Sequence, residues 1–127
     1  MQVGDVIAWE KTFTVDDVHA FRKISGDDGV YHITPDELDR LIVHGLLTAT
    51  LPTKIGGDLN FMARQMVFDF VRPVYTGDAI RCEITITSWE EGTDQFAMSA
   101  SWICTNQNGK EVLLGSAKGI IPKAYKK

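Results

Sequence analysis

The chain has 127 residues, of which 44% are hydrophobic and 24% charged. This length and composition predict one globular domain spanning residues 1–127, with a modest core. Its formal net charge of −4 argues against the overall basic surface of a nucleic-acid-binding protein, so no nucleic-acid partner is expected.

The first residues, MQVGDVIAWEKT, lack a charged segment followed by an apolar one, so no secretory signal is predicted. The two cysteines, Cys82 and Cys104, both lie in alternating apolar runs. We interpret them as small core residues of a reduced protein rather than as a disulfide or a metal site. We therefore expect a cytoplasmic location.

Two regular elements are predicted at the start of the chain. Residues 6–13 alternate as a short strand. Thr14 followed three residues later by Asp17 has the spacing of a capping box, so a helix is expected over residues 15–24. Gly26 is placed to end it.

A loop rich in glycine and aspartate follows and carries Asp27 and His32. Taken alone, this pair is weak, because a turn-forming aspartate and an ordinary loop histidine match it as well as a catalytic pair does. Thr34, Pro35 and Glu37 then have the pattern of a second helix start, with an N-cap, a proline in the first turn and a capping box.

Residues 41–55 are apolar on almost every side, which predicts a helix wrapped by the rest of the fold. We expect a bend near His44-Gly45 and an end at Gly56-Gly57. The element is too short and too interrupted by polar residues to span a membrane, so no membrane partner is expected.

Two readings apply to the start of this helix. His44 is interpreted as a structural residue whose ring bonds a carbonyl. For Gly45, a structural role and a functional role are equally supported: a helix-start N–H that no side chain shields can bind a substrate oxygen as an oxyanion site.

The second half of the chain is all strand. Alternating runs are found at residues 65–71, 79–88, 95–105 and 112–121. We predict that these four form a consecutive meander, each with one apolar face. Gly115, Ala117 and Gly119 share one face of the last run, where small residues allow a neighbour to pack closely.

An apolar sheet face needs a cover, and an apolar helix needs a wrapping. One arrangement meets both needs, namely an α+β fold in which a curved antiparallel sheet of about five strands surrounds a central helix. The sheet has two edges to protect, and pairing with a second copy protects one of them, so a homodimer or higher homo-oligomer is expected.

Three segments together resemble a known family: SGDxxxxH from Ser25, IVHGLLTATL from Ile42, and FMARQMVFDFVRPVYTGDAI from Phe61. They are similar to the MaoC-like hot-dog proteins, which include (R)-specific enoyl-CoA hydratases and related dehydratases, over nearly the whole chain. The resemblance implies a hot-dog fold, usually dimeric, and action on acyl thioesters of CoA or acyl carrier protein without a metal or other cofactor.

The resemblance also implies roles for four residues. Asp27 and His32 match the family's catalytic pair, Gly45 matches its oxyanion N–H, and Thr53 matches a hydroxyl residue that lines its site. The implied reaction interconverts trans-2-enoyl and (R)-3-hydroxyacyl thioesters. Asp27 is the expected base that activates water.

The chain departs from the family pattern in its loop, where Gly29-Val30 replaces an Asn-Pro pair and Thr34 replaces a second aspartate. The connections from His32 to His44 and from Lys54 to Asn60 are also shorter than in the family.

Two alternatives therefore stay open. One is a hot-dog acyl-CoA thioesterase that uses Asp27 or Asp28. The other is a non-catalytic subunit that binds an acyl thioester or pairs with an active partner.

Overall fold

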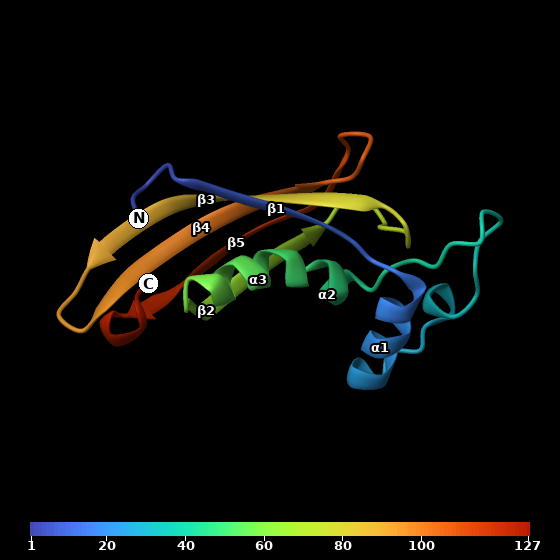
Figure 1. Cartoon of the computed structure of the whole chain (residues 1–127), viewed down its shortest axis with the longest axis horizontal. Coiled ribbons are helices and arrows are strands. Elements are labelled where there is room, and N and C mark those ends of the chain that lie inside the picture. The colour runs from blue at the N-terminus through green and yellow to red at the C-terminus, as the bar shows by residue number, and fades with distance from the viewer.

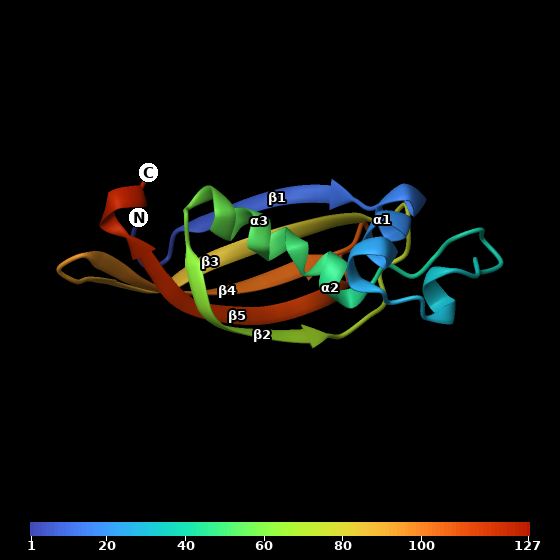
Figure 2. The same cartoon turned by 90° about the horizontal axis from the view of Figure 1, so that it is seen from below.

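The computed structural model describes residues 1–127 and contains one antiparallel sheet with helices against one face (Figure 1). Along the chain the elements are β1 (Val6–Thr12), α1 (Val15–Ser25), the 3-10 helix η1 (Val30–His32), α2 (Gly45–Thr48), α3 (Thr50–Asp58), β2 (Met62–Phe70), β3 (Ala79–Glu91), β4 (Gln95–Thr105), β5 (Glu111–Pro122) and the 3-10 helix η2 (Lys123–Tyr125). Seen from below, α3 crosses the sheet, whereas α1 lies beyond one end of it (Figure 2).

The strand order is β1-β3-β4-β5-β2, and every neighbouring pair is antiparallel. This confirms the predicted curved sheet with a helix on its face. The predicted four-strand meander is wrong, because β2 pairs with β5 at the far edge instead of with β3. The segment between β2 and β3 therefore connects strands that are not neighbours, and its Tyr75 bridges to Ile42.

The alternating faces of the long strands are buried as predicted. The inward side chains of β3 and β4 are less than a tenth exposed; they are Ile80, Cys82, Ile84, Ile86, Met98, Ala100, Trp102 and Cys104. Trp9 on β1 donates its indole N–H to the carbonyl of Leu51 at 2.9 Å. This bond joins α3 to the sheet in addition to the apolar packing.

The small residues of β5 also act as predicted. A Cβ atom at Gly115 would lie 2.7 Å from the ring of Trp102, and one at Gly119 would lie 2.7 Å from the ring of Phe61. Backbone of the neighbouring β2 is close as well, at Val67 and Met62. The absence of side chains at these positions lets two aromatic rings lie flat on the sheet.

The predicted helix after Thr34 is wrong, because the segment is an irregular loop. The carboxylate of Asp36 accepts hydrogen bonds from the N–H groups of Leu38 and Arg40, both at 2.9 Å, and from the Arg40 guanidinium at 2.8 and 3.0 Å. Asp39 adopts a left-handed conformation with φ of 61°. Aspartate side chains that bond nearby backbone in this way compete with helix formation.

The central helix differs from the prediction in three respects. Residues 41–43 are extended rather than helical; the helical part is divided at Ala49 into α2 and α3; and α3 continues through Gly56-Gly57 to Asp58. Pro52 has no N–H to donate to the preceding turn, which explains the division.

The helix is also less enclosed than predicted, since Leu46 is 62% exposed and Thr53 faces solvent. None of the helices combines the length and apolar character needed to cross a membrane.

Candidate active site

The connection between α1 and α2 lies beyond the end of the sheet (Figure 1), and it carries both Asp27 and His32. Asp27 Oδ2 is 3.8 Å from His32 Nε2. This distance is too long for a direct hydrogen bond. An oxygen atom placed about 2.8 Å from each group would fit between them and bond both. The structure therefore brings the predicted pair into a geometry that suits a shared water or hydroxyl.

The backbone and side chain of Asp27 are each held. Its N–H donates to Ser25 Oγ at 3.0 Å, its Oδ1 accepts from the N–H of Gly29 at 3.1 Å, and its carbonyl accepts from His44 Nε2 at 2.9 Å. Gly29, which stands where the family has asparagine, supplies a backbone N–H to the carboxylate. Oδ2 makes no hydrogen bond within the chain and faces His32.

His32 is fixed through its other nitrogen. Nδ1 lies 2.7 Å from the carbonyl oxygen of Ile42. A carbonyl only accepts, so the Nδ1 proton is assigned and Nε2 is left to face Asp27. The side chain is 13% exposed, compared with 56% for Asp27. The pair thus joins a nearly enclosed imidazole to a carboxylate that solvent reaches.

The extended segment 41–44 carries the supports of this pair. The N–H of Val43 donates to Val74 at 2.7 Å, and that of Thr76 donates to Leu41 at 2.9 Å. Leu41, Val43 and His44 are each at most 3% exposed. The segment that the sequence pattern suggested as helix is therefore a buried strand-like support, which offers the Ile42 carbonyl and the His44 ring to the loop.

Gly45 begins α2, so its N–H is one of those that have no partner within a helix. A Cβ atom here would lie 2.8 Å from the ring of Phe70. A hollow of ≈ 390 Å³ adjoins Gly45 and is bordered by Phe70 and Arg72. Glycine is therefore required for packing against Phe70, and its N–H remains a candidate oxyanion donor.

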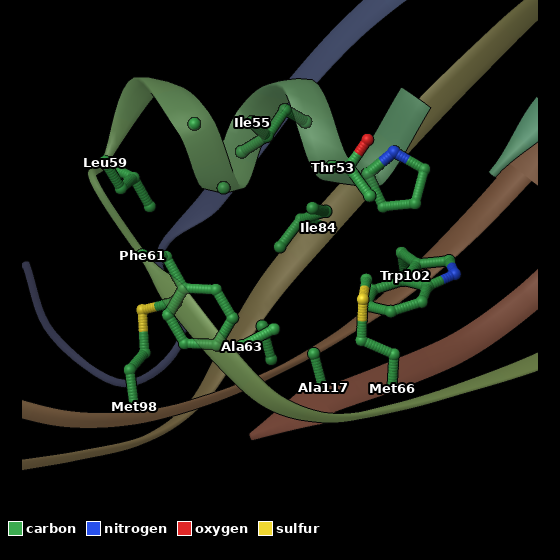
Figure 3. A pocket seen from close by; sticks show the side chains of 14 residues that line it. Thr53, Ile55, Leu59, Phe61, Ala63, Met66, Ile84, Met98, Trp102 and Ala117 are labelled. Carbon is green, nitrogen blue, oxygen red and sulfur yellow. The ribbon is translucent and has the colours of Figure 1, made fainter. Parts of the chain in front are cut away.

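Thr53 is not brought to the Asp27–His32 pair. It lies on α3, where its hydroxyl donates to the Thr50 carbonyl at 2.9 Å. Its side chain borders an apolar cavity of ≈ 220 Å³ between α3 and the sheet. Thr53 and Trp102 lie toward one end of this cavity, and Leu59 and Phe61 toward the other (Figure 3).

Asp28, the other carboxylate of the loop, is engaged elsewhere. Its Oδ1 accepts from Arg22 Nε at 2.8 Å on the exposed face of α1. The two neighbouring aspartates therefore differ in their surroundings, since Asp27 faces a histidine and Asp28 faces an arginine.

His44 makes one contact that the sequence predicted and a second contact that it did not predict. As predicted, its ring bonds a carbonyl, and the acceptor is the backbone oxygen of Asp27. It also stacks on His32, with ring centroids 3.6 Å apart and planes 16° from parallel. The sequence motif identified His44 as the residue before the helix but did not indicate this stacking. The stacking depends on how the loop that carries His32 folds back onto His44.

Asp27, His32 and His44 offer ligand atoms that all lie within 4.8 Å of one another. The two imidazole planes are nearly parallel, however, and His44 Nε2 is already bonded to the Asp27 carbonyl. Their lone pairs therefore do not converge on a point about 2.0 Å from both nitrogens, as a shared zinc ion requires.

No protein-family model matches the chain. A mitochondrial 3-hydroxyacyl-[acyl-carrier-protein] dehydratase of Arabidopsis thaliana is 27% identical over 131 residues, which cover 96% of this chain and 78% of the relative.

Among solved structures, the (R)-hydratase from A. caviae involved in PHA biosynthesis superposes with a TM-score of 0.85 at 25% identity, covering 96% of this chain and 98% of that one. A MaoC-like dehydratase from Rhodospirillum rubrum has a TM-score of 0.79 at 17% identity, covering 100% of this chain and 94% of that one, and shares the fold. The chain thus shares the hot-dog fold of these structures, and its sequence is similar to those of an (R)-hydratase and a 3-hydroxyacyl-[acyl-carrier-protein] dehydratase.

Proposed function

We propose that the chain is a hydratase/dehydratase that interconverts trans-2-enoyl and (R)-3-hydroxyacyl thioesters of CoA or acyl carrier protein. The observation that carries this proposal is the 3.8 Å approach of Asp27 Oδ2 to His32 Nε2, with each group held by separate backbone contacts. Similarity to the A. caviae (R)-hydratase and to the Arabidopsis dehydratase supports the reaction class.

In the hydration direction, a water between Asp27 and His32 loses a proton to Asp27 while its oxygen bonds to C3 of the enoyl group. The C2–C3 double bond electrons move to the α-carbon and the thioester oxygen. The N–H of Gly45 stabilises the negative charge on that oxygen. Addition of a proton at the α-carbon completes the hydroxyacyl product, and loss of the proton from Asp27 restores its carboxylate, so the net change is the addition of one water. Dehydration follows the same steps in reverse.

The acyl group needs an apolar chamber, and the cavity bordered by Thr53 supplies one. Ten of its fourteen lining residues are hydrophobic. Thr53 then acts as a substrate-binding residue at the mouth of this chamber and takes no part in proton transfer.

We also propose a homodimer joined through β2. This strand is at the sheet edge, and its residues Met62, Val67 and Phe70 are 46–53% exposed. An exposed apolar edge favours pairing with another strand. Val67→Lys should convert a dimer to a monomer in light scattering coupled to gel filtration, whereas a monomeric wild type would refute the proposal.

A cytoplasmic location remains part of the proposal, although the Arabidopsis relative is a mitochondrial protein. Fractionation of cells that express the tagged chain tests it, and recovery in an organelle or membrane fraction would contradict it.

The decisive experiment mixes purified protein with crotonyl-CoA and with a longer trans-2-enoyl-CoA. Loss of enoyl absorbance is followed together with release of free CoA. Hydration without free CoA is expected, whereas free CoA would indicate a thioesterase. Binding without turnover would indicate the partner-subunit alternative.

Variants locate the activity. Asp27→Asn and His32→Ala should each lower kcat by about 10²–10⁴-fold, as loss of a general acid or base does. Asp28→Asn is the matched control, because this carboxylate lies one residue away and faces Arg22. An Asp27→Asn variant with wild-type kcat would exclude the proposed mechanism.

A further inference from the structure

We propose that His44 is a positioning residue, whose single ring fixes both Asp27 and His32 for the reaction. This inference rests on the proposed function and adds to the pair a second imidazole, which touches neither water nor substrate. The ring is 2% exposed and contacts the pair in two ways, through its edge and through its face.

The edge contact holds the backbone of Asp27. His44 Nε2 lies 2.9 Å from the Asp27 carbonyl, which can only accept, so Nε2 carries the proton. The face contact holds the His32 ring at a centroid distance of 3.6 Å. The two contacts reach opposite ends of the six-residue segment from Asp27 to His32, and this segment contains Gly29 in place of a stiffer residue.

The His44 ring also has a second aromatic neighbour. Phe21 of α1 packs against it at a centroid distance of 4.9 Å and an interplanar angle of 56°. The His44 backbone is anchored by α2, because its carbonyl accepts from the N–H groups of Leu47 and Thr48, both at 3.0 Å. His44 thus fixes both Asp27 and His32 relative to the start of α2.

A buried, unpaired nitrogen argues against a role for His44 in packing alone. His44 Nδ1 is buried and has no hydrogen-bond partner in the protein. Leaving a buried polar group without a hydrogen bond destabilises the folded protein. Phenylalanine would give the same flat face without this cost, and glutamine would give the N–H donor. Histidine is the residue that provides the stacking face and the donor together.

Two substitutions separate these contacts. His44→Phe keeps the ring and removes the donor, whereas His44→Gln keeps a donor and removes the ring. Each should lower kcat on crotonyl-CoA about tenfold and change KM by less than about threefold, because the reacting groups are misplaced while the acyl site is intact. His19→Gln is the matched control, since His19 is exposed on α1.

A spectroscopic measurement is independent of turnover. The chain has three histidines, and long-range ¹H–¹⁵N spectra identify the protonated nitrogen of each neutral ring. We expect the proton on Nε2 of His44 and on Nδ1 of His32, and an altered His32 signal in His44→Gln, where the neighbouring ring is lost. A wild-type His44 protonated on Nδ1 would overturn the inference, even if neither variant folds.

The outcomes separate this inference from the proposed function. A wild type that hydrates no enoyl thioester refutes the proposed function, and the spectra then test the arrangement alone. An active wild type whose two His44 variants keep full kcat refutes the positioning role alone. So does a loss confined to the unfolding midpoint, since that reports packing without an effect on the pair.

Discussion

The two ends of this molecule are stabilised by different kinds of interaction. Around α3 and the sheet, apolar side chains at regular intervals pack together, and Gly115 and Gly119 let aromatic rings lie on β5. Around Asp27 and His32 the backbone is irregular, and single hydrogen bonds to carbonyls and carboxylates hold each group. The sheet end therefore determines stability, and the loop end determines the geometry of the candidate site.

Three glycine-to-alanine substitutions test this division, because the added methyl group is the same and the surroundings differ. Gly115→Ala should have the largest effect, since the new Cβ would lie 2.7 Å from the Trp102 ring and close to the backbone of Val67. Overpacking of this kind lowers the free energy of unfolding by about 1–3 kcal/mol. Urea denaturation measures it, with the neighbouring exposed Ser116→Ala as control. Equal stability of both variants would contradict the close packing.

Gly29→Ala should act on activity. Its Cβ would lie 3.3 Å from Asp27 Oδ1 and 3.5 Å from His32 Cδ2, so the pair must shift by a few tenths of an ångström. We expect kcat on crotonyl-CoA to fall about tenfold. The free energy of unfolding should stay the same or rise slightly, since alanine restricts the unfolded chain. Full activity in this variant would mean that the pair tolerates displacement.

Gly57→Ala should raise the free energy of unfolding, in contrast to Gly115→Ala, which should lower it. It lies within α3, and a Cβ there meets no atom within 4 Å. Alanine favours the helix, so the free energy of unfolding should rise by about 0.5–1 kcal/mol. The same urea titration measures it. A destabilised variant would show that the cavity beneath α3 is narrower than described.

Asp36→Asn should have the smallest effect, confined to the loop. Hydrogen bonds from Arg40 hold the pKa of Asp36 below its usual value. Because the folded-state pKa is depressed, this contact contributes fully above the ordinary value of 3.8 and is lost as the pH falls below it. Both side chains are 33–34% exposed, so the surrounding solvent weakens their attraction. We therefore expect faster amide exchange at Leu38 and Arg40 with an unchanged unfolding midpoint. Unchanged exchange would show that the carboxylate does not organise this loop.

Sequence periodicity predicted the sheet end well. The alternation from Ile80 to Ile86 has a single interpretation, and the long hairpin strands followed from it. Periodicity could not predict the strand order. An alternating pattern indicates which face of a strand is buried, but it does not indicate which strand is its neighbour. β2 pairs with β5 through residues that are far apart in the sequence, such as Met66 and Ala117.

The loop end was predicted in composition and not in shape. Family resemblance selected Asp27 and His32, and their proximity agrees with that choice. The pattern predicted a helix start at Thr34, Pro35 and Glu37. In the structure the Asp36 side chain instead accepts hydrogen bonds from the N–H groups of Leu38 and Arg40. Competition between a side chain and a local backbone pattern leaves no periodic signal, which is why the helix prediction failed and the stacking of His44 on His32 went unseen.

The two free cysteines, Cys82 and Cys104, are paired across β3 and β4. Their reactivity can therefore be used to measure opening of the sheet. A hydrogen bond with Cys82, together with burial, raises the pKa of the Cys104 thiol well above its usual value. Because the thiolate is the reactive form, folded protein should resist alkylating reagents. Labelling must then wait for β3 and β4 to separate, so its rate under native conditions measures how often the centre of the sheet opens. Rapid labelling of both thiols without denaturant would show that this opening needs no global unfolding.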